Sequence, residues 1–403
     1  MDPQFREAFN AAFDSARYER YRADLEGSLG CEVGFRLAET PVFFPAYLRE
    51  RCARAASEIV ATLSQPALVE RMRAAVPERY ARERPEGVPQ IACVDFAIVR
   101  GDDGRFEPKL VELQGFPSLF AFEIFQRDAW DRELQRVAGC DRDWSAWFSG
   151  DRDSYLSCLK QTILGAHDPQ SVVLLDLDPP AQKTSCDFAA TKLLLGVDAV
   201  DPRELTRRGA RLFRRGPSGA EIPVERIYYR LVPDELERSG RGSSAVLSGA
   251  LDVEWVPHPN WFWMWSKYSL PFLEHPAAPR TKLLSDVDAL PADLGANYVL
   301  KPLFSFAGAG VNVHPSAGDV GAIAPAERER WCLQEKIAYA PAIEAADGGS
   351  VKVEVRVMLL RPDGANELVP ATNLCRLSRG DLLGVDFNKN LTWVGSSIGI
   401  WPA

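Results

Sequence analysis

Hydrophobic residues recur every three or four positions through most of the first 80 residues, a period typical of amphipathic helices. The run "FRLAETPVFFPAYL" (35–48) interrupts this period with an extended segment, and the helical period returns between residues 53 and 76. We therefore expect residues 1–90 to form a mostly helical scaffold.

The pattern changes after residue 90. "IACVDFAIVR" (91–100) and "KLVELQGF" (109–116) are strand candidates, and the turn-rich segment between them predicts a β-hairpin. Helical spacing returns between 118 and 165. The short apolar run "SVVLLDLDP" (171–179), a capped helix from 184 and the strand-like "RIYYRLV" (226–232) then alternate. This alternation predicts an open α/β sheet.

The last third of the chain has a different style. The aromatic segment 260–268 is interpreted as core, and strand candidates separated by Gly-rich or Asp-Gly turns follow from residue 297. These strands predict an antiparallel sheet. The fold class is therefore α/β (α+β), in four regions: 1–90, 91–165, 166–255 and 256–403.

Composition and charge narrow the functional classes. The formal charge of −9 opposes a general nucleic-acid role, which needs a basic footprint. No segment approaches the roughly 18 apolar residues of a membrane span. The N-terminus has no apolar leader, so we expect a cytoplasmic protein. The eight cysteines include no C-x-x-C pair, and neither they nor the four dispersed histidines predict a metal site.

The stretch "YVLKPLFSFAGAGV" (298–311) is the first candidate for chemistry. Lys301 closes a predicted strand, and Gly308 and Gly310 follow in a turn of small residues. The turn matches neither a P-loop nor a dinucleotide-binding fingerprint. It is either a phosphate cradle of backbone N–H groups or an ordinary hairpin turn.

The neighbours of this turn carry a resemblance. Lys267 opens a helix upstream, and Gln334-Glu335-Lys336-Ile337 ends a strand downstream. This order resembles the ATP-grasp superfamily over residues 260–360. The resemblance implies that both lysines contact ATP phosphates and that the loop covers the phosphates. It also implies that Gln334 to Ile337 form a hinge that holds adenine. The implied loop residues are Ser305, Phe306, Ala307, Gly308 and Gly310.

The early hairpin supplies candidate Mg²⁺ ligands. Asp95 lies on one strand, and Glu112 and Gln114, two residues apart, share one face of the next. "KLVELQGFPSLFAFE" resembles the hairpin of circularly permuted, glutathionylspermidine synthase-like ATP-grasp ligases. Gln114 stands where that family has asparagine, and Cys93 where an arginine is common. Taken alone, such carboxylates are also typical of a solvated strand face.

Another arginine must then stabilise the transition-state charge, because Cys93 cannot. The candidates are Arg230, Arg356 and Arg376. Each of them could instead be an ordinary ion-pair residue. Ser118 either binds substrate at a helix N-terminus or only caps that helix. Asp386 and Asn388 are a further candidate site for a metal or a substrate.

The resemblance implies an ATP-dependent, Mg²⁺-dependent ligase that joins a carboxylate to an amine through an acyl phosphate, releasing ADP and phosphate. The amine would belong to an amino acid, peptide or polyamine. Two alternatives share the nucleotide contacts: a catalytically inactive nucleotide-binding scaffold or sensor, and a small-molecule kinase.

Overall fold

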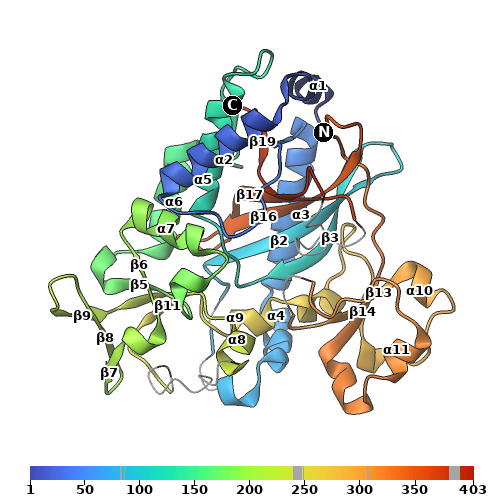
Figure 1. Ribbon diagram of the computed structural model, residues 1–403. Helices are drawn as coiled ribbons and strands as arrows, with labels where there is room; N and C mark the ends of the chain where they lie inside the picture. The colour runs from blue at the N-terminus through green and yellow to red at the C-terminus, as the bar shows by residue number, and fades with distance from the viewer. Residues whose placement is uncertain (82–83, 86, 239–246, 248, 306–307, 381–390) are drawn as a thin grey trace.

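The computed structural model describes the chain apart from residues 82–83, 86, 239–246, 248, 306–307 and 381–390. It is a mixed α/β fold with several antiparallel sheets and one parallel sheet. A central sheet built from early and late strands carries helices above it, and two smaller lobes lie below (Figure 1). The α+β character expected from the sequence is confirmed.

The central sheet has the order β18-β17-β16-β2-β3, with β15 beside β16, and all its pairs are antiparallel. Its strands are β2 (Ile91–Arg100), β3 (Phe106–Gln114), β15 (Ile343–Glu344), β16 (Ser350–Leu360), β17 (Val369–Ser378) and β18 (Gly395–Ser397). β2 is almost continuously apolar because both its faces are buried, β16 is also buried on both faces but carries Glu354 and Arg356 on one of them, and the edge strand β3 alternates in burial. The predicted hairpin is confirmed.

Helices from the N-terminal half pack on this sheet or on one another: α1 (Pro3–Ala12), α2 (Ser15–Leu29), α3 (Ala46–Leu63), α5 (Phe122–Leu134) and α6 (Arg152–Ile163). Helix α4 (Pro66–Met72) instead lies below the sheet (Figure 1). Asp2, Asp14 and Asp151 cap the first turns of α1, α2 and α6 through their side chains. The predicted extended interruption contains β1 (Val42–Phe43), which pairs with β19 (Gly399–Pro402), and β19 pairs with β4 (Trp144–Ser145).

The middle region forms a four-stranded parallel sheet of order β11-β10-β5-β6, as the alternation predicted. Its strands are β5 (Val172–Leu175), β6 (Asp198–Val200), β10 (Arg226–Tyr229) and β11 (Glu254–Val256), with α7 (Ser185–Leu195) and α8 (Pro233–Arg238). The antiparallel sheet β7 (Thr206–Arg208), β8 (Arg211–Arg215) and β9 (Glu221–Val224) projects at the lower left of Figure 1. The predicted cap of α7 makes no side-chain hydrogen bond.

The expectation of a single antiparallel sheet after residue 297 is wrong. β14 (Trp331–Glu335) pairs with both β12 (Thr281–Leu283) and β13 (Tyr298–Pro302) in a separate lobe with α10 (Leu294–Asn297) and α11 (Ala317–Gly321). β16 and β17 instead join the sheet of β2. The small sheet packs one face on its own hydrophobic cluster, whereas β16 is buried on both faces. The predicted strand 310–315 is only a bridge between Leu300 and Asn312, and 382–387 lies outside the described residues.

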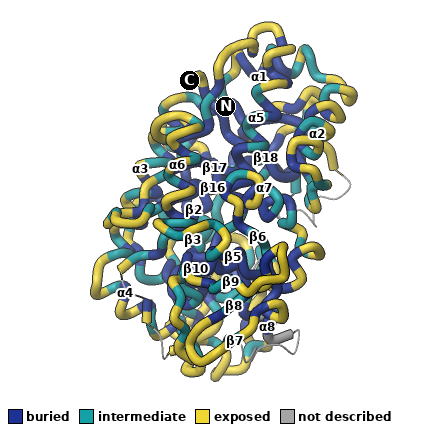
Figure 2. The backbone as a smooth tube through the Cα atoms, turned by 90° about the vertical axis from the view of Figure 1, so that its left-hand side faces the viewer, coloured by how far each residue is buried: buried dark blue, intermediate teal, exposed yellow. Residues whose placement is uncertain are grey.

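Buried residues run along the central and parallel sheets (Figure 2). The edge of β3 is covered by the segment 265–277, since Leu110 N–H donates to Ala277 O and Gly115 N–H donates to Trp265 O, both at 2.7 Å. That segment contains the 3₁₀ helix η6 (Lys267–Phe272) and directly follows α9 (Trp261–Met264). These bonds bring the early hairpin against the late lysine region. Among the described residues, no helix is long and apolar enough to cross a bilayer.

Candidate functional site

The hairpin β2–β3 builds one wall of the candidate site. Asp95 lies opposite Glu112, Cys93 lies opposite Gln114, and the register shifts between Asp95 and Phe96. The shift leaves Val111 as an extra residue in β3, and such bulges re-aim neighbouring side chains. The Gln114 Nε2 group donates to Glu112 at 2.5 Å and to Asp95 at 3.3 Å. The three predicted metal-ligand side chains therefore lie together.

Two of the three candidate arginines lie beside Asp95. The Arg356 Nε and Nη2 groups donate to the two Asp95 oxygens, each at 2.7 Å, and Arg376 donates to Oδ2. Burial alone would lower the pKa of Arg356, but the adjacent Asp95 carboxylate outweighs it and raises that pKa. Strands β16 and β17 thus place two arginines beside Asp95. The resemblance would have placed an arginine at position 93, which Cys93 occupies; whether these two take its role stays a prediction.

Two further residues complete this cluster. Glu354 forms an ion pair with Arg376 at 2.5 Å and accepts a hydrogen bond from the Tyr339 hydroxyl at 3.0 Å. Burial raises the pKa of Glu354, although Arg376 opposes the shift. The sequence offered a signal for Glu354, because it stands two residues before Arg356 on one strand face. Tyr339 follows no strand pattern and had no such signal.

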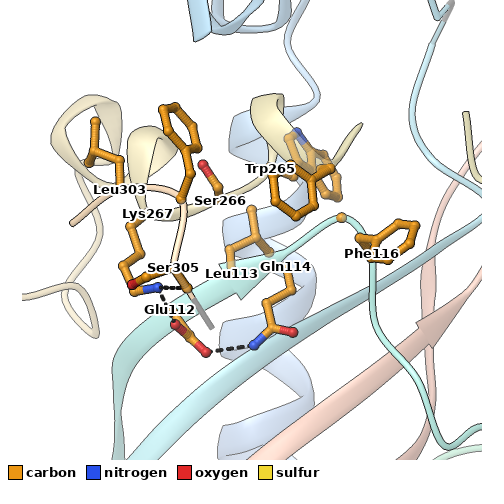
Figure 3. Close-up of a pocket in the computed structure, with 12 residues that line it drawn as sticks. Glu112, Leu113, Gln114, Phe116, Trp265, Ser266, Lys267, Leu303 and Ser305 are labelled. Carbon is orange, nitrogen blue, oxygen red and sulfur yellow. Dashed lines mark hydrogen bonds and ion pairs between the residues drawn. The ribbon is translucent and has the colours of Figure 1, made fainter. Parts of the chain in front are cut away.

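Lys267 is the first link between hairpin and late segment. It begins η6, whose N-terminus is capped by the Ser266 hydroxyl, which accepts from Tyr268 N–H. Its Nζ atom lies 3.2 Å from Glu112 Oε2 and donates to Ser305 O at 2.6 Å (Figure 3). One ammonium group therefore joins the acidic hairpin to the start of the glycine loop.

Lys301 is the second link. It lies on β13, and its Nζ donates to Val111 O at 3.3 Å and to the Gln334 side-chain oxygen. Lys301 is 7% exposed and forms no ion pair within the described part of the chain. Burial lowers the pKa of this lysine. A buried ammonium that lacks a carboxylate partner is costly and is suited to an anionic ligand.

A small hollow opens between these two parts. It is lined by residues 112–116, Phe262, 265–267 and 303–305. Glu112, Gln114 and Lys267 lie at one side of it, and aromatic side chains lie at the other (Figure 3). Gly115 permits the close packing here, since a Cβ would lie 2.7 Å from Trp261 O. The aromatic segment is core as predicted, although Phe262 and Trp265 also line the hollow.

Cationic groups outnumber carboxylates in the cluster. Lys267, Lys301, Arg356 and Arg376 face the carboxylates of Asp95, Glu112 and Glu354. Burial acts to raise the pKa of Glu112, but Lys267 and the two arginines outweigh it and hold that pKa below its usual value. The excess of positive charge suits a polyanion such as a triphosphate.

The donor set fits Mg²⁺ only in part. Both Asp95 oxygens already accept hydrogen bonds from guanidinium groups, so Asp95 anchors the arginines in this arrangement. Glu112 is partly accessible and keeps lone pairs for a hard cation. Within the described residues, no group of three His, Cys, Asp or Glu side chains is placed to hold a metal ion. Glu112 is therefore the carboxylate best placed to bind a metal that arrives with phosphate.

The glycine loop is only partly described. Gly308 and Gly310 adopt left-handed backbone angles, with φ of 76° and 73°, which glycine accepts without strain. Ser305 Oγ donates to Pro302 O at 3.3 Å. Phe306 and Ala307 lie outside the described residues, as do Asp386 and Asn388. The glycines meet the demands of a turn, and their contact with phosphate stays a prediction.

The predicted adenine hinge has its polar groups engaged within the protein. The Gln334 side chain contacts Lys301 and Thr281, and Glu335 accepts from Arg280 Nε at 2.6 Å. The backbone N–H groups of Glu335 and Lys336 donate to carbonyl groups of Arg280 and Asn297. Ile337 is half-buried. Binding of adenine by Gln334 to Ile337 stays a prediction.

Arg230 lies apart from the Asp95 cluster. It follows β10, is 7% exposed, donates to Pro117 O, and its guanidinium carbon lies 5.0 Å from the ring centre of Phe116. Phe116 lines the hollow, so Arg230 lies behind that wall. Asp176 follows the neighbouring parallel strand β5, and its Oδ1 accepts from Leu177 N–H at 2.8 Å.

Ser118 does not cap a helix. Helix α5 begins at Phe122, and the buried Asp187 carboxylate accepts from the backbone N–H groups of Leu119, Ala121 and Phe122 at 2.9–3.1 Å. These donors are therefore engaged by a protein carboxylate. Substrate binding by Ser118 stays a prediction, and Asp187 had no signal in the sequence.

No protein-family model and no curated protein matches the sequence. Among solved structures, the chain is similar to the apo form of a glutathione synthetase-like effector from Globodera pallida, with 14% identity, a TM-score of 0.57, and coverage of 92% of this chain and 96% of that one. A candidate gamma-glutamylcysteine synthetase from Methylobacillus flagellatus KT matches over 86% of each chain at 14% identity, but its TM-score of 0.37 supports no statement about fold. The chain thus shares its overall fold with this effector.

Proposed function

We propose that this protein is an ATP-dependent carboxylate–amine ligase with a circularly permuted ATP-grasp arrangement. The observation that carries the proposal is the contact between Lys267 and Glu112 at 3.2 Å, with Lys301 reaching Val111 O on the same strand. An acidic hairpin and two lysines, far apart in sequence, are thereby held together, and Glu112 and Lys267 line the hollow. The fold shared with a glutathione synthetase-like effector supports the same class.

The residues divide into distinct roles in this proposal. Lys267 and Lys301 bind the phosphates of ATP, and Arg356 and Arg376, held by Asp95, stabilise negative charge as the phosphoryl group moves to a substrate carboxylate. Glu112, with Gln114 beside it, would hold Mg²⁺, which supplies charge neutralisation when bound. The amine then displaces phosphate from the acyl phosphate, and an amide forms.

The aromatic side of the hollow is assigned to the carboxylate and amine substrates. Phe116 separates this side from Arg230, and the carboxyl ends of parallel strands are a common location for ligands. Arg230 would then orient a substrate anion rather than contact the γ-phosphate.

The direct test is product formation. Purified protein with MgATP is incubated with a panel of carboxylates and amines, and ADP release and product mass are measured. Hydroxylamine added in place of the amine should trap the activated carboxylate as a hydroxamate. A phosphorylated product that hydroxylamine does not consume would assign the protein to the kinase class, and absence of ADP with every pair would contradict the ligase proposal.

Glu112→Gln is expected to lower turnover about 100-fold or more while ATP still binds, because the amide cannot neutralise or ligate a cation as the carboxylate does. Steady-state ADP release and ATP titration separate the two effects. Glu107→Gln is a matched control on the same strand, where Glu107 forms an ion pair with the half-buried Lys109. Equal turnover of Glu112→Gln and the wild type would favour another role for this carboxylate.

Asp176→Asn is expected to change the pH dependence of stability. Burial raises the pKa of Asp176 to about 7. A raised pKa stabilises the fold only while the group is protonated, so this contribution is present below about pH 4 and is lost as the pH rises to about 7. The wild type should lose up to about 4 kcal/mol over that window relative to Asp176→Asn, measured by urea unfolding. The exposed Asp153→Asn should behave like the wild type, and parallel curves for Asp176→Asn and the wild type would contradict the shift.

A further inference from the structure

The projecting sheet β7–β8–β9 carries an unusual concentration of positive charge. Between Arg203 and Arg215 the sequence contains six arginines and one glutamate, although the whole chain has a formal charge of −9. The sheet lies at the surface on the side that Figure 2 faces, with exposed residues along β7 and β8. It lies away from the hollow described above, and this inference does not rest on the proposed ligase activity.

The strand period sorts these side chains by face. On β8, Leu212 and Arg214 are 0% and 6% exposed and point toward the parallel sheet, where Leu212 joins the hydrophobic cluster. The alternate residues Arg211, Phe213 and Arg215 face outward. Arg208 of β7 pairs directly with Arg211. We call Arg208, Arg211, Phe213 and Arg215 the arginine face.

The charges of the arginine face are not balanced within the protein. Arg208 reaches Glu221 at 2.7 Å. Arg211 and Arg215 are exposed and form no ion pair in the described ranges of the chain, although Glu221 lies opposite Arg215 in the sheet. Like charges directly opposite one another on neighbouring strands destabilise a sheet, and Arg208 and Arg211 are so placed. Among the described residues, Glu221 is the one carboxylate paired with this face, and it pairs with Arg208.

The occupant that fits best is a carboxylate-rich polypeptide. Guanidinium groups form paired hydrogen bonds with carboxylates. The guanidinium carbons of Arg208 and Arg211 lie 5.1 and 5.3 Å from the Phe213 ring centre, so the only aromatic ring of this face is already engaged and is a poor platform for a nucleic-acid base. A second copy docking through the same face would bring arginine against arginine, which is repulsive.

We propose that the arginine face is a docking surface for an acidic segment of a partner protein. Its arginines would bind the partner's Asp or Glu carboxylates beside Phe213, and the negative charge of the rest of the molecule would disfavour docking elsewhere.

The test uses the full-length protein and a fluorescent octa-glutamate peptide, with anisotropy measured at about 50 mM salt and at higher salt. The wild type is expected to bind saturably, with affinity that falls as salt rises. Arg211→Glu/Arg215→Glu should weaken binding at least tenfold. Arg54→Glu/Lys160→Glu makes the same change in net charge at exposed positions of α3 and α6 and should stay within twofold of the wild type.

Three results would overturn the proposal: no saturable binding by the wild type, equal binding by Arg211→Glu/Arg215→Glu, or equal losses in the control. Single-stranded DNA and phosphatidylserine vesicles are titrated in parallel. Tighter binding of either one, abolished by the same double substitution, would assign the face to nucleic acid or membrane and reject the acidic segment. Because both positions are exposed, Arg211→Glu/Arg215→Glu should keep the wild-type Tm. Arg211→Lys/Arg215→Lys should bind the peptide about threefold more weakly, because lysine keeps the charge but loses the guanidinium geometry.

Discussion

Lys301→Met is expected to weaken ATP binding about 100-fold while leaving the ligand-free protein at least as stable as the wild type. A hydrogen bond to a charged group contributes about 1.5–3 kcal/mol, which corresponds to this loss. The stability prediction follows because the acceptors of the buried Lys301 ammonium among the described residues, Val111 O and the Gln334 side chain, are both uncharged. Burial disfavours the charged form of Lys301. Methionine therefore removes the free-energy cost of burying a charge, with little change in side-chain shape. Titration calorimetry and thermal unfolding measure the two effects separately.

Lys109→Met is the matched control for this substitution. Lys109 lies on β3, and its ammonium donates to Pro276 O at 3.1 Å near the surface. Its loss should leave ATP affinity unchanged. A large fall in the stability of Lys301→Met, or unchanged affinity, would show that Lys301 is a structural residue of the small sheet rather than a ligand-binding one.

Asp95→Asn is expected to destabilise the protein by about 3–5 kcal/mol, with a fall in Tm of roughly 5–10 °C. Asp95 is fully buried and accepts hydrogen bonds from Arg356 and Arg376. Replacing the carboxylate by an amide leaves two guanidinium groups beside each other without their shared counter-ion. Thermal and urea unfolding measure the loss.

Asp103→Asn provides the comparison for Asp95→Asn, since Asp103 lies in the turn of the same hairpin and pairs with Arg51 near the surface. Its Tm should stay close to that of the wild type, because exposed ion pairs contribute little. If Asp95→Asn were equally mild, the arginines would have other counter-ions, and Glu354 would be the first to examine.

The sequence predicted the elements whose pattern is local. The apolar runs of β2 and β5, the helical period of α3, and the shared face of Glu112 and Gln114 all follow from spacing along the chain. The hairpin, the parallel sheet and the proximity of Lys267 to Glu112 were expected on those grounds and from the resemblance.

Partners that meet only through tertiary contacts were not predictable. Strands β13 and β16 have similar apolar character, and nothing in their sequences shows that they enter different sheets. The capping of α5 by Asp187 joins residues more than sixty positions apart, and Tyr339 reaches Glu354 from an irregular segment. The bidentate pairing of Asp95 with Arg356 likewise depends on register between β2 and β16, which spacing along one strand cannot give.

The position of a bound triphosphate tests the central claim most directly. A crystal structure with Mg²⁺ and a non-hydrolysable ATP analogue should place the phosphate oxygens within about 4 Å of Lys267 and Lys301 Nζ, with the metal beside Glu112. Phosphates bound elsewhere on the molecule, or no bound analogue at saturating concentration, would contradict the account.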